Sequence, residues 1–525
     1  MNQFIKKHEP MIVGQLSGFD RVRFRGTIRM LAAVSGIVAW MVDCTGSGLL
    51  KGFGDFADDL TERLGRSVEQ VAKLAGRPIK YLASSLLSKE DLVQELLARE
   101  CITEGLVCVL SCVEPCRSFD IHRDPETKRI ELVRAYRKCK HWYVYFVDSL
   151  LGLCHVRIQS WLPFTVHVCV NGREWLCREL DAAGIGYRRR DNCLVDVADF
   201  DAAQKRLDAQ PWLNWTETLN SLLDRACPLL SSLRFRGSPF RYYWSADETE
   251  WATDILFRSS EQLAGLYPSL IRHAMTTFSS CDVLRFLGRS RSAMTTGVHH
   301  SFQGEVVSDV KTRPEGVRIK HRVNVNSIKM YDKQGSVLRI ETTINDARDM
   351  KVFRAAESDP SGPKSWRTLR KGVVDLPRRT QISQTANTSY LSALAAVDAQ
   401  IPLGQVVDAV STPVTRDGQR ARALNPITGQ DARFAALLQR GEFTINGFRN
   451  RDIRPLLYPQ DETPIQKRRS SGKVTRLLRL FRAHNLIRKI PGTHRYQLTA
   501  TGRRTLAAFV IARNASTEKL NTIAA

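Results

Sequence analysis

The residues best suited to chemistry lie in one predicted β-hairpin at 316–346, GVRIKHRVNVNSIKMYDKQGSVLRIETTIND. A three-residue turn is predicted at Lys333-Gln334-Gly335, because Gly335 can adopt the left-handed conformation that such a hairpin requires. Side chains alternate along a strand, so the hairpin has two different faces. The predicted apolar face carries Ile328, Met330, Leu338, Ile340, Thr342 and Ile344. The opposite face carries Lys329, Tyr331, Arg339, Glu341 and Thr343. A two-residue turn would mix apolar and charged residues on both faces, so the pattern specifies the register.

A tyrosine hydroxyl beside a carboxylate and basic groups could attack a phosphodiester. Phosphoryl transfer needs a metal ion or basic side chains to neutralise the phosphoryl oxygens. Hard cations such as Mg²⁺ or Mn²⁺ prefer carboxylate oxygens. If such a phosphoryl transfer occurs, we expect Mg²⁺ or Mn²⁺ as its cofactor, with Glu341, Asp254, Asp309 and His321 as the candidate ligands.

The segment IKMYDK…VLRIETTI resembles the YDK…LR(I/V)E strand pair of rolling-circle replication initiators, both plasmid replication proteins and the gene II proteins of filamentous phages. In that family a tyrosine attacks DNA and stays joined to the 5′ phosphate, while a carboxylate and histidines hold a divalent metal. The resemblance implies catalytic roles for Tyr331, Lys333, Arg339 and Glu341, and it covers about 30 of the 525 residues. The wider chain also resembles a group of uncharacterised bacterial proteins, which implies no function.

The same hairpin also has a purely structural interpretation, in which its polar face makes cross-strand pairs among Lys329, Arg339 and Glu341. A metal-dependent nicking site normally has two histidines separated by one apolar residue on a strand. No such pair occurs in this chain. His299 and His300 are adjacent, so on a strand they would point to opposite sides. Both interpretations stay open at the level of sequence.

A second candidate site is the basic C-terminal segment. No acidic residue occurs between 466 and 495. The predicted helix SSGKVTRLLRLFRAHNL buries one stripe, formed by Val474, Leu477, Leu478 and Phe481 at positions i, i+3, i+4 and i+7. Its opposite face carries Arg469, Lys473 and Arg476. The basic residues expected to bind nucleic acid are Arg468, Arg469, Lys473, Arg476, Arg479, Arg488, Lys489 and Arg495.

The element order predicted for residues 431–513 is helix, short strand, helix, helix, hairpin, helix. This pattern resembles the winged helix-turn-helix domains of bacterial regulators and replication initiators, over about 85 residues. The resemblance implies that the third helix enters the major groove while the hairpin contacts phosphates. Such binding should weaken steeply with salt, because neutralised phosphates release counterions. A solvated basic surface on a protein-docking module is the alternative interpretation.

The elements that must position these residues belong to a chain of several domains. The sequence has 525 residues, 78 Lys and Arg against 54 Asp and Glu, and a net charge of +24. Its composition is that of a globular protein and excludes disordered, collagen-like and coiled-coil classes. The longest apolar run is shorter than the roughly 20 residues of a membrane span. The N-terminus lacks the pattern of a secretory signal, and the twelve cysteines are interpreted as reduced core thiols. We expect a cytoplasmic protein without a membrane partner.

The predicted fold class is α+β and multidomain, with antiparallel-sheet domains. The expected segments are a helical N-terminal region at 1–105, an α+β domain at 106–212, a second α+β domain with the candidate site at 213–355, a helical segment and linker at 356–430, and a winged helix at 431–525. The helical segment is expected to include WRTLRKGVVDLPRR, and residues 401–430 are expected to be the linker.

The preferred functional hypothesis is a DNA-binding, replication-initiator-like protein of a mobile or plasmid-like element, able to nick DNA if Tyr331 is catalytic. A non-enzymatic transcriptional regulator is one alternative, and an RNA-binding protein is another. Its partners would be duplex or single-stranded DNA or RNA, with a homodimer possible.

Overall fold

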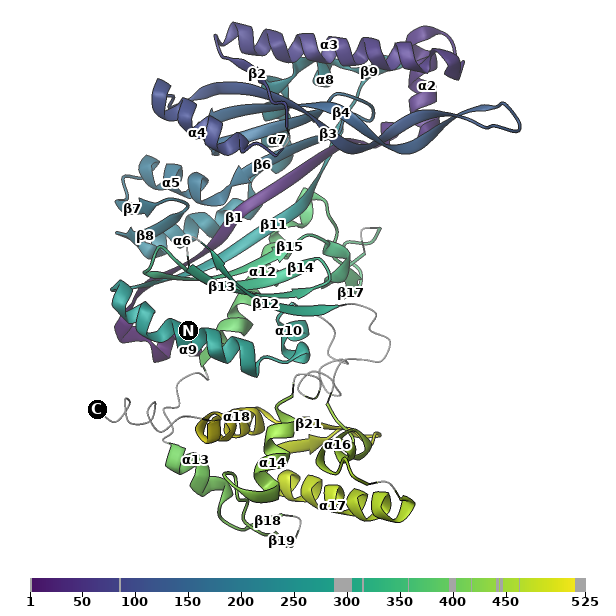
Figure 1. The fold of residues 1–525 in the computed structure, drawn as a ribbon. Helices are drawn as coiled ribbons and strands as arrows, with labels where there is room; N and C mark the ends of the chain where they lie inside the picture. The colour runs from purple at the N-terminus through teal and green to yellow at the C-terminus, as the bar shows by residue number, and fades with distance from the viewer. Residues whose placement is uncertain are drawn as a thin grey trace. The chain divides into compact units, whose positions relative to one another are not determined.

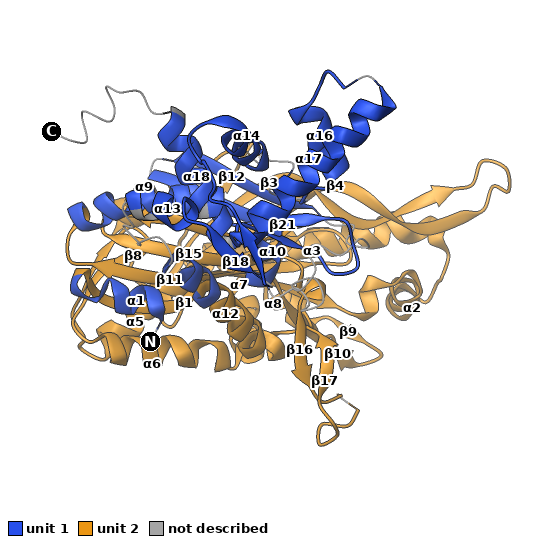
Figure 2. Ribbon diagram, turned by 90° about the horizontal axis from the view of Figure 1, so that it is seen from below, with its two compact units in different colours: residues 1–10, 261–324, 388–525 blue, residues 11–260, 325–387 orange. Residues whose placement is uncertain are grey.

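The computed structural model confirms a mixed α+β protein with a large sheet and many helices. It describes residues 2–514 apart from 85, 288–304, 314–315, 357, 396–402, 417, 441–442, 444–446 and 462. The chain forms two compact units, shown in Figure 2. Unit 1 comprises residues 1–10, 261–324 and 388–525, and unit 2 comprises residues 11–260 and 325–387. The five predicted segments therefore do not correspond one to one with these units.

Unit 2 is built on one large sheet, with the strand order β14-β15-β11-β1-β6-β5-β4-β3-β2 (Figure 1). All neighbouring pairs for which a register is given are antiparallel, except β2 and β3, which run parallel. The bounds are β1 Ile12–Ile28, β2 Ile79–Tyr81, β3 Gly105–Arg123, β4 Ile130–Asp148, β5 Gly152–Gln159, β6 Val166–Asn171, β11 Tyr242–Phe257, β14 Asn326–Lys333 and β15 Val337–Ile344.

The strand β1 corrects the prediction of a helical region at 1–105. It pairs with β11 on one side and β6 on the other, in the interior of the sheet. Val22 and Phe24 are buried and alternate with arginines, which is the pattern of a half-buried strand. The register shifts between Phe19 and Arg21, a β-bulge that leaves Asp20 outside the regular pairing. Helices do occur in the rest of the segment, at α2 Val34–Thr45, α3 Phe53–Leu74 and α4 Lys89–Glu100.

Helices cover the large sheet of unit 2. These include α5 Gly172–Ala182, α6 Phe200–Ala209, α7 Trp215–Ala226 and α8 Pro228–Ser232. A β-carbon added at Gly14 or Gly18 of β1 would meet Phe200 or Leu207 of α6 at 2.5 Å, so the glycines let α6 lie directly on the strand. The core of this unit is a cluster of buried aliphatic and aromatic residues from the sheet and these helices.

A long helix, α12 Leu376–Leu394, also begins in unit 2. The buried Asn387 side chain bonds to Thr342 Oγ1 at 2.6 Å and to the Ile340 carbonyl at 3.1 Å. Residues 376–387 therefore pack on the apolar face of β15. The predicted helix WRTLRKGVVDLPRR is wrong in its first part, because Ser365–Thr368 forms strand β17, which pairs with β16 Lys351–Arg354.

The cysteines agree in part with the core interpretation. All twelve are free thiols, and most of them are buried, whereas Cys44 and Cys101 are exposed. None of the helices that the structure describes combines the length and the apolar character that a membrane crossing requires.

Unit 1 contains helices α1 Gln3–Lys7, α9 Ser260–Thr277 and α10 Ser280–Phe286, and the paired strands β12 Val306–Arg313 and β13 Gly316–Val323. Its C-terminal part comprises α13 Leu403–Val410, β18 Val414–Arg416, β19 Gln419–Ala421, α14 Gly429–Leu438, α16 Asn450–Leu457, α17 Pro464–Ala483, β20 Ile487–Lys489, β21 Tyr496–Leu498 and α18 Ala500–Asn514. We call residues 403–514 the C-terminal module.

The predicted linker at 401–430 is wrong for its described residues, which form α13 and the β18–β19 hairpin. Val410 and Leu424 are buried in the same apolar cluster as Phe434 and Phe481. The C-terminal module therefore begins before residue 431, because its core includes side chains from the segment that composition suggested was a linker.

Candidate functional site

The β14–β15 hairpin has the two faces that the sequence predicts. Lys329 is paired with Glu341 and Tyr331 with Arg339, so the charged residues share one side. Three residues, Gln334 to Ser336, connect the paired Lys333 and Val337. The turn thus lies one residue later than predicted, with Gly335 at a φ of 78°. The loop still contains three residues, so each side chain keeps its predicted face.

A buried cluster of arginines and carboxylates crosses this face of the sheet. Arg339, which is 1% exposed, donates from Nε and Nη2 to the two oxygens of Asp254 at 2.6 and 2.9 Å. Its Nη1 lies 2.7 Å from Asp20 Oδ1, on the residue displaced by the β1 bulge. Arg173 of α5 reaches the same Asp254 at 2.9 Å. Bidentate pairs of this kind hold both partners in a fixed geometry.

A second set of contacts surrounds the candidate nucleophile. Tyr331 donates its hydroxyl hydrogen to Glu341 Oε2 at 2.7 Å. Lys329 Nζ lies 2.6 Å from Glu341 Oε1 and 3.1 Å from Glu250 Oε1. Arg21 of β1 also contacts Glu250, at 3.3 Å. The hairpin therefore shares two neighbouring sets of polar contacts with β1 and β11, which together form the polar network of this face. Arg339 belongs to the first set, and Tyr331 and Glu341 belong to the second.

Burial and charge act in opposite directions on the pKa values of this network. Burial would raise the pKa of Glu341, but Lys329, Arg339 and Tyr331 together outweigh it and hold that pKa below its usual value. The pKa of Asp254 is lowered because Arg173 and Arg339 outweigh its burial. Burial and the neighbouring Glu341 raise the pKa of Tyr331 well above its ordinary value. Glu341 and Asp254 are therefore ionised and the phenol is neutral, so Tyr331 would need Glu341 as a base to attack. Burial acts differently on Asp20 and Glu250, because it raises the pKa of each.

Lys333, the fourth residue of the resemblance, contacts Asp191 at 2.9 Å and makes no contact with Tyr331 or Glu341 that the structure records. Asp191 adjoins Asn192, whose side chain donates to Asp20. Neither Asp20 nor Glu250 was predicted from the sequence. The sequence feature that could have indicated Asp20 is its position within the alternating basic and apolar residues of β1.

The four predicted metal ligands fall in different units. Glu341 and Asp254 lie in unit 2, where each carboxylate is already bound by a cationic side chain. Asp309 and His321 lie in unit 1, where Asp309 is 3.6 Å from Arg318. Within the described residues, no group of three or more His, Cys, Asp or Glu side chains has the geometry of a metal site. His299 and His300 lie outside the described residues.

His321 is held by two hydroxyl groups. Its Nδ1 lies 2.7 Å from Ser308 Oγ and its Nε2 lies 3.1 Å from the Tyr390 hydroxyl. The ring is fully buried, beside Phe278. With both nitrogens engaged, His321 cross-links β12, β13 and the C-terminal end of α12, which is a structural role.

Acidification is expected to destabilise unit 1 through His321. Burial lowers the pKa of His321 to about 4, although Asp309 acts in the opposite direction. Since the folded-state pKa lies below the ordinary value of about 6.5, the contribution to stability is complete above that pH and falls as the pH decreases towards 4. Between pH 6.5 and pH 5 the loss is about 2 kcal/mol.

Urea unfolding followed by far-UV circular dichroism at both pH values measures this loss. All nine tryptophans lie in unit 2, so tryptophan fluorescence identifies the transition of that unit separately. His321→Asn cannot take up the proton and should lose less stability over the same interval. An equal loss in the unaltered chain and in His321→Asn would show that other groups cause it.

The C-terminal module has most of the predicted elements, in the predicted order. The third helix, α17, begins at Pro464 rather than 470, and Thr463 caps it through a capping box with Gln466. The predicted stripe of Val474, Leu477, Leu478 and Phe481 is buried. Most of the predicted short strand EFTING lies outside the described residues, although Phe448 just after it bridges to Tyr496.

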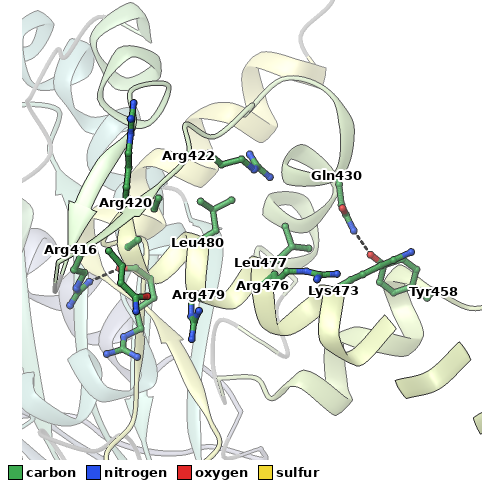
Figure 3. Close-up of a pocket in the computed structure, with 14 residues that line it drawn as sticks. Arg416, Arg420, Arg422, Gln430, Tyr458, Lys473, Arg476, Leu477, Arg479 and Leu480 are labelled. Carbon is green, nitrogen blue, oxygen red and sulfur yellow. Dashed lines mark hydrogen bonds between the residues drawn. The ribbon is translucent and has the colours of Figure 1, made fainter. Parts of the chain in front are cut away.

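The basic face of α17 lines a cleft of about 760 Å³ (Figure 3). From α17 the cleft receives Lys473, Arg476, Arg479 and Arg482. The β18–β19 hairpin and the residue after it add Arg416, Arg420 and Arg422, which sequence reasoning missed because it assigned this segment to a linker. Tyr458 lies under Lys473, whose Nζ is 5.5 Å from the ring centroid.

Little negative charge balances this cleft. Arg422 forms a bidentate pair with Asp431 at 2.7 and 2.8 Å. Among the described residues, Lys473, Arg476 and Arg479 have no acidic partner. Several like charges facing one cavity repel one another, and an anion placed there would relieve the repulsion. The arrangement therefore suits a phosphate-bearing ligand.

The other predicted nucleic-acid contacts lie around this cleft. Arg488 and Lys489 of β20 line a smaller adjoining pocket of about 330 Å³, together with Arg416 and Arg482. Arg468 and Arg469 are exposed near the N-terminus of α17 and do not line the larger cleft. Arg495 is partly buried, and its Nη1 lies 3.4 Å from the Gly447 carbonyl.

No family model, curated protein sequence or solved structure matches the chain. The resemblance to replication initiators therefore stays a prediction from the sequence.

Proposed function

We propose that the protein binds DNA through its C-terminal module, which acts as a winged helix. In this proposal α17 is the recognition helix and the β20–β21 hairpin is the wing. The observation that carries the proposal is the cleft lined by seven cationic side chains, four of them from α17. A rigid helix with basic side chains on one face and a buried stripe on the other suits insertion into a major groove.

The β18–β19 hairpin extends the proposed interface. Arg416 and Arg420 stand beside the basic face of α17, so they can contact phosphates flanking the groove. Phosphate contacts position the protein, and base contacts specify the sequence. A regulator and a replication initiator would both use such an interface. The cytoplasmic location, the homodimer and the mobile-element origin expected from the sequence remain predictions.

Fluorescence anisotropy with a labelled duplex at several salt concentrations tests this proposal. If six of the exposed basic residues contact phosphates, log Kd should change against log salt with a slope of about 5. Single-stranded RNA of equal length serves as the competing ligand. Preference for this RNA over the duplex at equal salt would favour the RNA-binding alternative, and affinity independent of salt would contradict the proposed interface.

DNA nicking at Tyr331 is the second candidate function, favoured by the 2.7 Å hydrogen bond between its hydroxyl and Glu341. In the reaction, Glu341 would take the phenol proton as the tyrosine oxygen bonds to phosphorus. The 3′ oxygen of the cleaved strand would then leave, and the 5′ phosphate would stay on the tyrosine. Lys329 and the arginines of the network would have to stabilise the charge on the phosphoryl oxygens.

Incubating the protein with supercoiled plasmid and Mg²⁺ or Mn²⁺ is expected to yield a covalent protein–DNA adduct, and Tyr331→Phe to yield none. Tyr331→Phe keeps the ring and removes one hydrogen bond to a charged group, at a stability cost of about 1.5–3 kcal/mol. Its fold is checked by tryptophan fluorescence. An adduct formed equally by the well-folded Tyr331→Phe chain would remove Tyr331 from this role.

A further inference from the structure

The β16–β17 hairpin presents two aromatic side chains to solvent. Phe353 and Trp366 are direct cross-strand partners, with ring centroids 5.6 Å apart. They are 57% and 69% exposed. This two-stranded ribbon is separate from the large sheet and projects from the body of unit 2 in Figure 2. Contact between aromatic rings and water is unfavourable in the free protein. A Trp and a Phe that are paired and exposed therefore indicate a contact surface.

Basic residues surround the aromatic pair. Lys351 and Lys364 are exposed, and Lys351 shares the face of Phe353 because strand side chains alternate. Arg354 and Arg367 lie on the opposite face, and their Nε atoms are buried without a hydrogen-bond partner among the described residues. Between 350 and 368, Asp359 is the only acid that the structure describes.

The positive charges lie close enough to influence one another. Burial, followed by the charge of nearby Arg370, lowers the pKa of Arg354, and Arg378 and Arg367 act in the same direction. Arg370 and Arg378 pair with Asp375, but the described residues give Lys351, Lys364 and Arg367 no acidic partner. A hydrophobic partner would leave these three charges uncompensated, whereas a polyanion that also carries planar aromatic groups satisfies both features. Single-stranded nucleic acid has that chemistry, because its bases are unpaired and its backbone carries one phosphate for each nucleotide.

We propose that the β16–β17 hairpin binds single-stranded nucleic acid, with unpaired bases stacking on Trp366 and Phe353 and the phosphates contacting Lys351 and Lys364. The shared chemistry is an unpaired base on a phosphodiester backbone, which both DNA and RNA provide. This site uses residues of unit 2, whereas the proposed duplex interface uses residues of unit 1. The two can therefore succeed or fail separately.

The test measures anisotropy of the full chain with labelled oligothymidine, oligouridine and a mixed-sequence duplex at equal salt. Trp366→Ala and Phe353→Ala should each weaken single-strand binding about tenfold, since a stacked base contributes about 1–3 kcal/mol. Duplex binding should change less than about twofold. Trp366→Phe keeps a stacking surface and should restore most of the single-strand affinity. The oligonucleotide that binds more tightly identifies whether the natural ligand is single-stranded DNA or single-stranded RNA.

Trp212 supplies a matched control, because it is also in unit 2 and is 71% exposed. Trp212→Ala should leave binding of both single strands unchanged. An abasic strand of equal length keeps the phosphates without the bases, so the unaltered chain and Trp366→Ala should bind it equally. Unchanged affinity of Trp366→Ala and Phe353→Ala for both oligonucleotides would overturn the proposal. Equal loss for single strand and duplex would overturn it too, since stacking requires unpaired bases.

Discussion

Replacing Arg339 with methionine is expected to destabilise unit 2 by about 3–5 kcal/mol. The substitution leaves Asp254 and Asp20 in a buried environment without the guanidinium that both contact. Arg173 still reaches Asp254, but a carboxylate that loses one of its buried partners must pay part of its desolvation cost. The long apolar methionine fills much of the vacated space, so the loss measures the charge rather than a cavity. Urea unfolding followed by tryptophan fluorescence reports this unit alone, because all nine tryptophans belong to it.

Arg348 provides the control for this substitution. Its side chain is 77% exposed and pairs with Asp346 at 2.7 Å. Exposed ion pairs contribute about 0–1 kcal/mol, so Arg348→Met should unfold close to the unaltered chain. If Arg339→Met proves as stable as Arg348→Met, the buried network is not needed for folding. In that case the network would have to be retained for chemistry at Tyr331, and this result would favour the nicking proposal.

Reversing two charges in the C-terminal cleft, Lys473→Glu with Arg476→Glu, is expected to weaken duplex DNA binding by roughly 100-fold or more. Each basic contact contributes about 1–3 kcal/mol to recognition, and each acid introduced also repels the phosphates. Both side chains are exposed, so the fold of α17 should persist. The affinity measured against salt should also show a smaller slope, by about 2, because two phosphate contacts are lost.

The matched control reverses two arginines of α3 in unit 2. Arg63 and Arg66 form i,i+4 pairs with Asp59 and Glu62, so their charges are locally balanced. Arg63→Glu with Arg66→Glu changes the net charge equally but should weaken duplex binding far less. A similar loss of duplex affinity in both double variants would mean that net charge alone attracts DNA. That result would contradict the proposed α17 interface.

The sequence was most informative where one local pattern decides the structure. In the β14–β15 hairpin, the face of each side chain follows from the strand period and the odd number of loop residues. A one-residue error in the turn position therefore changed nothing, and Tyr331, Arg339 and Glu341 share the predicted face. The buried stripe of α17 followed from the helical period in the same way.

Local reasoning failed where long-range contacts or an irregularity decide the element. In β1, the bulge at Asp20 interrupts the alternation, so Phe19 is out of step with Val22 and Phe24, and all four residues from Leu16 to Phe19 are buried. The strand is stabilised by pairing with β11, more than 200 residues away in the chain. The β18–β19 hairpin is short and polar, and it owes its place to the packing of its neighbours Val410 and Leu424 in the core of the C-terminal module.

From the sequence alone came the α+β class, the two faces of the central hairpin and the basic character of α17, because period and charge are local properties of a chain. Only the tertiary structure brought Asp20, Arg173 and Glu250 to the hairpin and three arginines to α17. It also placed Asp309 and His321 in a different unit from Glu341. Which distant segments come into contact depends on the surface that the whole fold buries, and a short sequence pattern carries no information about that total.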